Sequence, residues 1–233
     1  VTDNGEMSLV EHLQELRRRI IISLVALCGC STLCYLYSDK LVTYLTVSVG
    51  KLYYMNPAEA FFVNLKVSLF VGCLLALPVF MYQAWAFVLP ALGSKARKAT
   101  GVLGTASAIL FITGMGFSYY FVLPVGIKFF KGFETEDLHP LFSVGDYFSF
   151  VVSFLVPFGV LFELPLLILV LAWFNFVSSK FLISKRKVMI VLAFIVGAII
   201  APSPDVISQA MIAVPMIILY EMSIIAVKLI LEK

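Results

Sequence analysis

The sequence predicts an all-α integral membrane protein with six transmembrane helices, and two observations carry this prediction. The mean hydropathy is +1.03, and hydrophobic residues make up 61% of the 233 positions whereas charged residues make up only 13%. Soluble domains carry about 25% charged residues, so the composition excludes that class. The second observation is that Lys and Arg gather between alternate apolar runs, which predicts how those runs cross the membrane.

The chain is predicted to form a single membrane domain over residues 1–233, with a cytoplasmic amphipathic segment at 1–19. That segment lacks the basic-then-apolar order of a cleavable signal peptide, so the first apolar helix is expected to be an uncleaved anchor. Apolar runs long enough to form membrane helices predict six spans. They are expected at about residues 20–37, 61–89, 100–123, 147–176, 188–201 and 206–225.

Proline positions and span lengths predict departures from straight helices. Pro78 lies inside the second span. The fourth span is overlong and contains Pro157 and Pro165, so it is expected to be tilted or kinked. The last two spans are expected to be short, because residues 188–201 rise only about 21 Å against a hydrocarbon core of about 30 Å. Gly114 and Gly116 in the third span are expected to allow close helix packing.

The distribution of cations predicts that both termini are cytoplasmic. Of the seventeen Lys and Arg residues, five fall in the predicted outer segments and twelve in the inner ones. The inner twelve are Arg17, Arg18, Arg19, Lys95, Arg97, Lys98, Lys180, Lys185, Arg186, Lys187, Lys228 and Lys233.

Glu163 is the least expected residue in such a chain, because it lies in the middle of an apolar span. A charged group at the bilayer centre costs about 2.5–3.5 kcal/mol, so it normally faces a partner, a cavity or a polar substrate. The alternative is a protonated Glu that hydrogen-bonds a neighbouring helix and only supports the structure. Gln83, Asp205 and Gln209 are predicted, with Glu163, to form intramembrane polar sites or contacts with partner subunits.

Two carboxylates lie on the N-terminal helix, Glu11 and Glu15. Paired carboxylates suit the binding of guanidinium groups through charge-assisted hydrogen bonds. The alternative is a solvated helix face on which Glu15 pairs with nearby arginines. No motif for catalysis, a metal, a cofactor or nucleic acid is present, so the protein is expected not to be an enzyme and to need none of these ligands.

Several segments in the same order resemble the twin-arginine protein translocase subunit TatC family. The N-terminal segment resembles that family's "HLxELRxR" motif, and the inner end of the second span resembles its "PvxxYQxWxFxxPAL" motif. The fourth span and the final hairpin match the family as well. The segments that carry the resemblance are His12 to Arg19, Leu77 to Leu92, Ser149 to Pro165 and Ala201 to Pro215.

The resemblance implies a glove-shaped, six-helix receptor core that exports folded proteins across the cell inner membrane. It implies that twin-arginine signal peptides bind at Glu15, Leu16, Arg17 and Phe87. From helix spacing, Glu11 is expected to be a second acceptor, because it lies one turn from Glu15. It implies that single-span subunits of the TatA and TatB type contact Glu163. The protein is expected to work in an oligomeric complex, in contact with membrane lipid.

One position departs from the family pattern, and one other function stays open. Ala96 stands where the family usually has an acidic residue, so half of the expected arginine-recognition site is missing. The alternative function is a proton-coupled small-solute transporter that uses Glu163 as a relay. Such a transporter is expected to have broken helices in corresponding halves, whereas the short spans here lie only in the C-terminal hairpin.

Overall fold

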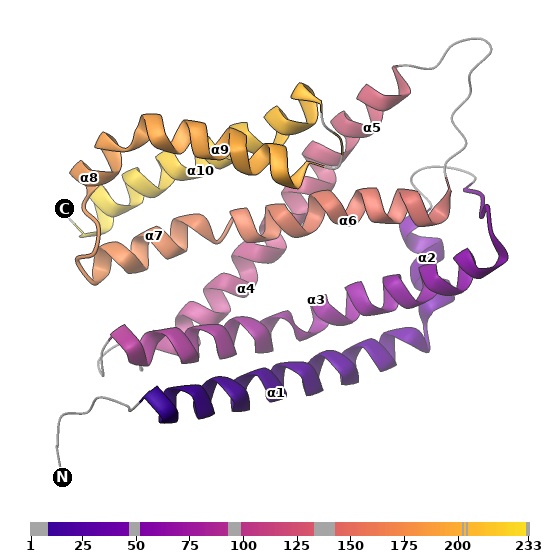
Figure 1. Cartoon of the computed structure of the whole chain (residues 1–233), viewed down its shortest axis with the longest axis horizontal. Helices are drawn as coiled ribbons and strands as arrows, with labels where there is room; N and C mark the ends of the chain where they lie inside the picture. Colours follow the sequence, from indigo (N-terminus) through magenta and orange to yellow (C-terminus); the bar gives the residue numbers. More distant parts are fainter. Residues whose placement is uncertain are drawn as a thin grey trace. The chain divides into compact units, whose positions relative to one another are not determined.

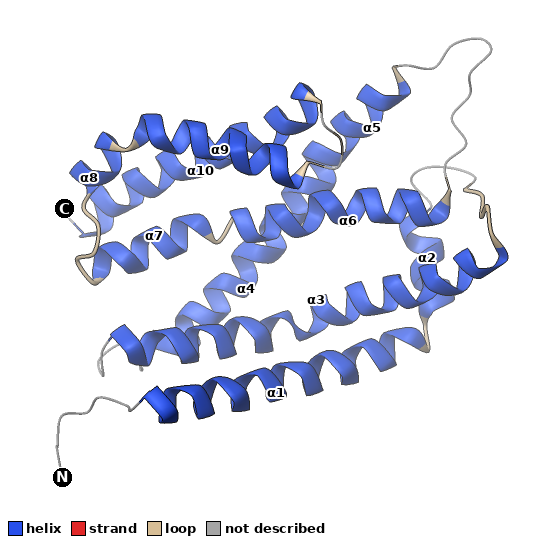
Figure 2. Ribbon diagram, in the orientation of Figure 1, coloured by secondary structure: helices blue, strands red, loops and turns tan. Residues whose placement is uncertain are grey.

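The computed structural model describes residues 9–46, 52–92, 99–132, 143–201, 203 and 205–231, and nearly all of them are helical (Figure 2). Within these ranges the only extended pairing is an isolated bridge between Tyr53 and Ser143. The predicted all-α class is confirmed. Ala96 lies outside the described residues.

Five helical stretches are long and apolar enough to cross a membrane, so the chain is a multi-pass membrane protein. They are Val10–Tyr35, Pro57–Leu89, Thr100–Lys131, Val144–Trp173 and Val206–Ile230. The chain folds into two compact units. The first holds the described residues up to Ala108 with residues 143–145, and the second holds the remainder.

In the first unit, α1 (Leu9–Tyr35) runs alongside α3 (Pro57–Leu92), and the short α2 (Ser38–Thr46) lies between them in the chain (Figure 1). Gly72 on α3 allows this approach, because a Cβ there would collide with Ser31 of α1. Pro78 does not interrupt α3, which is continuous over 36 residues. Only one face of α1 is covered by α3, and its other face is exposed.

The start of α4 (Thr100–Phe117) completes the first unit. Trp85 on α3 donates from Nε1 to Ser107 Oγ on α4 at 2.6 Å, and both residues are buried. A buried indole N–H needs such an acceptor, so this bond fixes where α3 and α4 meet.

In the second unit, α4 continues through a π-helical turn at Ser118–Val122 into α5 (Leu123–Lys131). This helix is therefore longer than the predicted third span. Gly114 permits close packing as predicted, because a Cβ there would collide with the Phe158 carbonyl of α6 (Val144–Leu161). The same prediction for Gly116 is wrong, because a Cβ there would meet nothing within 4 Å.

The C-terminal part of this unit contains α7 (Leu164–Trp173), α8 (Ser179–Ser184), α9 (Arg186–Ile200) and α10 (Val206–Leu231), and α9 and α10 form a hairpin (Figure 1). Tyr220 is buried and donates its hydroxyl to the carbonyl of Leu182 at 2.8 Å. The buried core here consists of Ala172, Leu182, Tyr220, Ile224 and Val227.

The hairpin confirms one length prediction and corrects another. α9 has 15 residues, so it rises only about 23 Å and is short as predicted. α10 has 26 residues, so the prediction that the last helix is short and ends near residue 225 is wrong. After residue 225 the mostly apolar sequence continues to Leu231 without Gly or Pro. Lys228 in the last turn suits the negative end of the helix dipole.

Candidate functional site

A polar cluster joins α1 to α3 in the first unit. Glu15 and Arg19 lie one turn apart on α1, where Arg19 Nε donates to Glu15 Oε1 at 3.2 Å and Nη2 pairs with the same oxygen. Arg19 Nη1 donates to Gln83 Oε1 on α3 at 2.9 Å. The side chains of Arg19 and Glu15 are only 20% and 19% exposed. The pair is therefore better shielded from solvent than an ordinary surface ion pair.

One carboxylate oxygen of Glu15 accepts no hydrogen bond from the described residues. This oxygen, Oε2, is buried. A buried acceptor left in this state costs about 1–3 kcal/mol, and more when it is charged. A donor that reached Oε2 would recover this cost, so the position favours a ligand with N–H groups.

Aromatic and apolar side chains lie next to this carboxylate. The rings of His12 on α1 and Phe87 on α3 stack with their centroids 4.3 Å apart and an angle of 19° between their planes. Phe87 and Leu16 are half-buried, so each still offers apolar surface. The structure thus brings α3, with the predicted residue Phe87, against the part of α1 that carries the predicted residues Glu15 and Leu16. It adds Gln83, which was grouped with the intramembrane sites.

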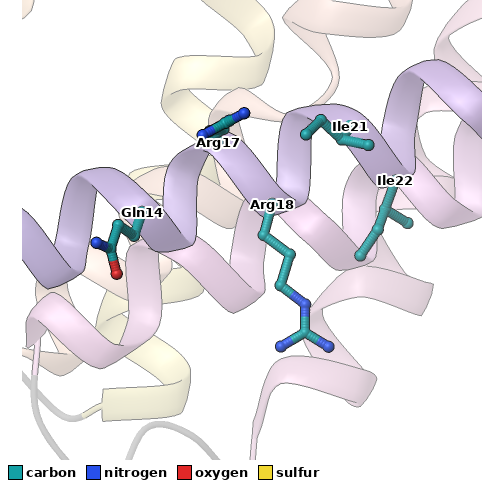
Figure 3. A pocket seen from close by; sticks show the side chains of 5 residues that line it. All are labelled: Gln14, Arg17, Arg18, Ile21 and Ile22. Atoms are coloured by element: carbon teal, nitrogen blue, oxygen red, sulfur yellow. The ribbon is translucent and has the colours of Figure 1, made fainter.

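Two other predicted residues lie apart from this cluster. Arg17 is exposed and lies on a different face of α1, with Gln14, Arg18, Ile21 and Ile22 (Figure 3). Glu11 is exposed one turn before Glu15.

Glu163 lies in the second unit at a break between two helices. α6 ends at Leu161 and α7 begins at Leu164, with Pro165 in its first turn. Pro165 has no N–H, so the helical hydrogen bond to the Leu161 carbonyl is missing. Just before it, the Glu163 N–H donates to the Val160 carbonyl at 3.1 Å, three residues back, which forms a tighter turn than an α-helix. The predicted kink is confirmed. The Glu163 side chain is buried, with 9% of its surface exposed.

Asp205 and Gln209 make bonds within the α9–α10 hairpin. Asp205 Oδ1 accepts from the Ser208 N–H at 2.7 Å and so caps α10. Burial raises the pKa of Asp205, but hydrogen bonds from Ser203 and Ser208 outweigh it and hold the pKa below its usual value. Gln209 Nε2 donates to the Phe194 carbonyl on α9 at 2.7 Å. Asp205 therefore fixes the start of α10, and Gln209 joins α10 to α9.

Glu59 is a structural residue that the sequence interpretation did not identify. Its Oε1 accepts from the Ser143 hydroxyl and from the Gly145 N–H, the latter at 2.8 Å, and its Oε2 accepts from the Met55 N–H at 2.7 Å. A local signal was present, because Asn56 followed by Glu59 matches a capping pattern, and Asn56 Oδ1 does accept from the Ala58 N–H at 3.2 Å.

The chain is similar to known proteins over nearly its whole length. The family model of Sec-independent protein translocase protein (TatC) matches residues 11–215. The Sec-independent protein translocase protein TatC of Carboxydothermus hydrogenoformans is 38% identical over 235 residues, which cover 99% of this chain and 97% of that protein. The protein of the same name from Aquifex aeolicus is 40% identical over 235 residues, with 97% of each chain covered. A crystal structure of the twin arginine translocase receptor TatC in DDM matches with a TM-score of 0.81 and 38% identity, and covers 94% of this chain and 100% of that one.

Proposed function

The chain belongs to the TatC family of Sec-independent protein translocases, and from this membership and the geometry of α1 and α3 we propose that it is the receptor of a twin-arginine translocation system. It binds the signal peptides of folded precursor proteins and takes part in their export across the membrane. The observation that carries this proposal is the buried, unbonded Oε2 of Glu15. The transporter alternative has no support from the relatives.

The proposed recognition has a polar and an apolar part. Arg19 already shows that a guanidinium group fits against Glu15, and an arginine of the signal peptide donates to the remaining oxygen, Oε2. Leu16 and Phe87 offer apolar contact, which adds to the roughly 1.5–3 kcal/mol that a hydrogen bond to a charged group contributes. Glu11 serves as a second acceptor one turn away.

A comparison of two peptides tests the proposed function. A signal peptide with paired arginines is expected to bind about tenfold more tightly than the same peptide with paired lysines, because a guanidinium group is more weakly hydrated than an ammonium group and loses less free energy on reaching the buried Oε2. Fluorescence anisotropy with the purified full-length protein measures both dissociation constants. Equal affinities would show that only net charge is recognised, and would contradict an arginine site at Glu15.

The second unit contains Glu163, the residue at which partner subunits are proposed to dock. We propose that single-span subunits of the TatA and TatB type dock near Glu163, since a buried acid in an apolar helix is suited to hydrogen-bonding a partner's helix. Asp205 and Gln209 support this site indirectly, because Asp205 caps α10 and Gln209 joins α10 to α9. The proposed assembly is oligomeric.

The proposed location is the cell inner membrane, with both termini in the cytoplasm. The twelve-to-five division of cations predicts that a thiol-reactive reagent outside intact cells labels Glu136→Cys and does not label Lys95→Cys. The background for both variants lacks the natural Cys28, Cys30, Cys34 and Cys73. Labelling of Lys95→Cys without labelling of Glu136→Cys would reverse the topology.

A further inference from the structure

The face of α1 that lies away from the Glu15 cluster carries two pockets. The first, of about 340 Å³, is lined by Gln14, Arg17, Arg18, Ile21 and Ile22 (Figure 3). The second, of about 680 Å³, is lined by Leu24, Val25, Cys28, Gly29, Thr32 and Leu33. With 3.6 residues per turn, the two sets centre on the same side of the helix. The pockets therefore follow one another along a single face.

The first pocket is cationic, and its two arginines, Arg17 and Arg18, are exposed and not in ion pairs with any described residue. This differs from Arg19, which is bonded to Glu15 and Gln83. In Figure 3 the two guanidinium groups point to different sides of α1, but both side chains are exposed and long enough to turn towards one anion with several oxygen atoms, such as a phosphate group.

The second pocket is apolar and lies about one lipid leaflet further along the helix than the arginines. From Arg18 to Gly29 the helix rises about 17 Å, close to half of the hydrocarbon thickness of about 30 Å. Gly29 leaves open space, since a Cβ there would meet nothing within 4 Å. Ile21 and Ile22 belong to the first pocket and continue the apolar surface towards the second.

We propose that this face of α1 is a binding site for one anionic phospholipid. The phosphate group binds Arg17 and Arg18, with the Gln14 amide as a further donor. An acyl chain runs over Ile21 and Ile22 into the pocket beside Gly29. The charge of the first pocket and the apolar lining of the second select this occupant, and the inference does not rest on signal-peptide binding.

Native mass spectrometry of the purified full-length protein tests the headgroup, with phosphatidylglycerol and phosphatidylcholine as probes. The double variant R17Q/R18Q is expected to bind phosphatidylglycerol about thirtyfold more weakly, at about 1 kcal/mol for each cation. R17K/R18K is expected to retain most of the binding because it keeps both charges. The control K180Q/K187Q removes two exposed cations elsewhere and is expected to change the affinity less than threefold. Equal losses in R17Q/R18Q and in this control would overturn the proposal, as would equal affinity for the two lipids.

A second pair of variants tests the acyl-chain pocket. Gly29→Leu places a side chain in the pocket and is expected to weaken phosphatidylglycerol binding severalfold. Gly101→Leu adds the same side chain at another exposed glycine with open space around it, and is expected to leave binding unchanged. Equal effects of the two would overturn the acyl-chain assignment. If R17Q/R18Q weakened signal-peptide binding and left lipid binding intact, the occupant would be the peptide and the proposal would fail.

Discussion

Glu15→Gln is expected to weaken the binding of a twin-arginine signal peptide by at least tenfold. The substitution removes the negative charge of the acceptor and keeps its size. Hydrogen bonds to charged groups contribute about 1.5–3 kcal/mol, and 1.4 kcal/mol corresponds to a tenfold change in affinity. The fold should persist, because Arg19 keeps its bond to Gln83 and a Gln side chain at position 15 still offers an oxygen.

Arg19→Gln is expected to act in the opposite direction. Arg19 now occupies Oε1 of Glu15 and neutralises its charge, so it competes with the incoming arginine. Its removal frees both oxygens for a bidentate bond, and the affinity for the peptide is expected to rise severalfold. The comparison requires isothermal titration of both variants under the same ionic strength, because salt screens these interactions.

Glu11→Gln is the matched control for Glu15→Gln. It removes the same charge one turn away, at an exposed position. Exposed ion pairs contribute about 0–1 kcal/mol, so the affinity is expected to fall less than about fivefold. If Glu11→Gln and Glu15→Gln weakened binding equally, the peptide would be responding to the general negative potential of α1, and the cluster of Glu15, Arg19 and Gln83 would not be the site.

The sequence predicted the helices well because each depends on local order. Long apolar runs predicted the five long stretches, and Pro165 after Glu163 predicted the break between α6 and α7. The end of α10 was misplaced because the apolar sequence continues past residue 225 to Leu231 and no Gly or Pro marks a stop there. Local patterns therefore locate helices better than they locate helix ends.

The candidate site was only partly predictable, because it depends on contacts between distant segments. Spacing alone placed Glu15 within reach of an arginine one turn away. It gave no indication that Gln83, 64 residues from Arg19, completes the cluster, since that contact exists only when α1 packs on α3. Glu59 was missed for the same reason, because its partner Ser143 lies 84 residues away.

The second large effect is expected at Glu163. Glu163→Ala should reduce crosslinking to a single-span partner subunit by about tenfold, since hydrogen bonds between membrane helices contribute about 1–2 kcal/mol. Glu163→Gln should retain most of the crosslinking, because a carboxamide of similar size also hydrogen-bonds a polar side chain on the partner's helix. Site-specific photocrosslinking in membranes, together with an export assay, measures both variants.

Leu161→Ala separates this role from simple loss of packing. Leu161 is buried two residues before Glu163, at the end of α6. Its truncation leaves a cavity that costs about 2–5 kcal/mol of stability but removes no polar group. The Leu161→Ala protein is expected to melt at a lower temperature than the wild type and to keep its partner crosslinks, whereas Glu163→Ala is expected to lose crosslinks with a smaller change in melting temperature. Equal, near-complete loss of crosslinking and export in Glu163→Gln and Glu163→Ala would contradict docking by hydrogen bond. Gln can hydrogen-bond but cannot change its protonation state, so such a result would mean that Glu163 must titrate.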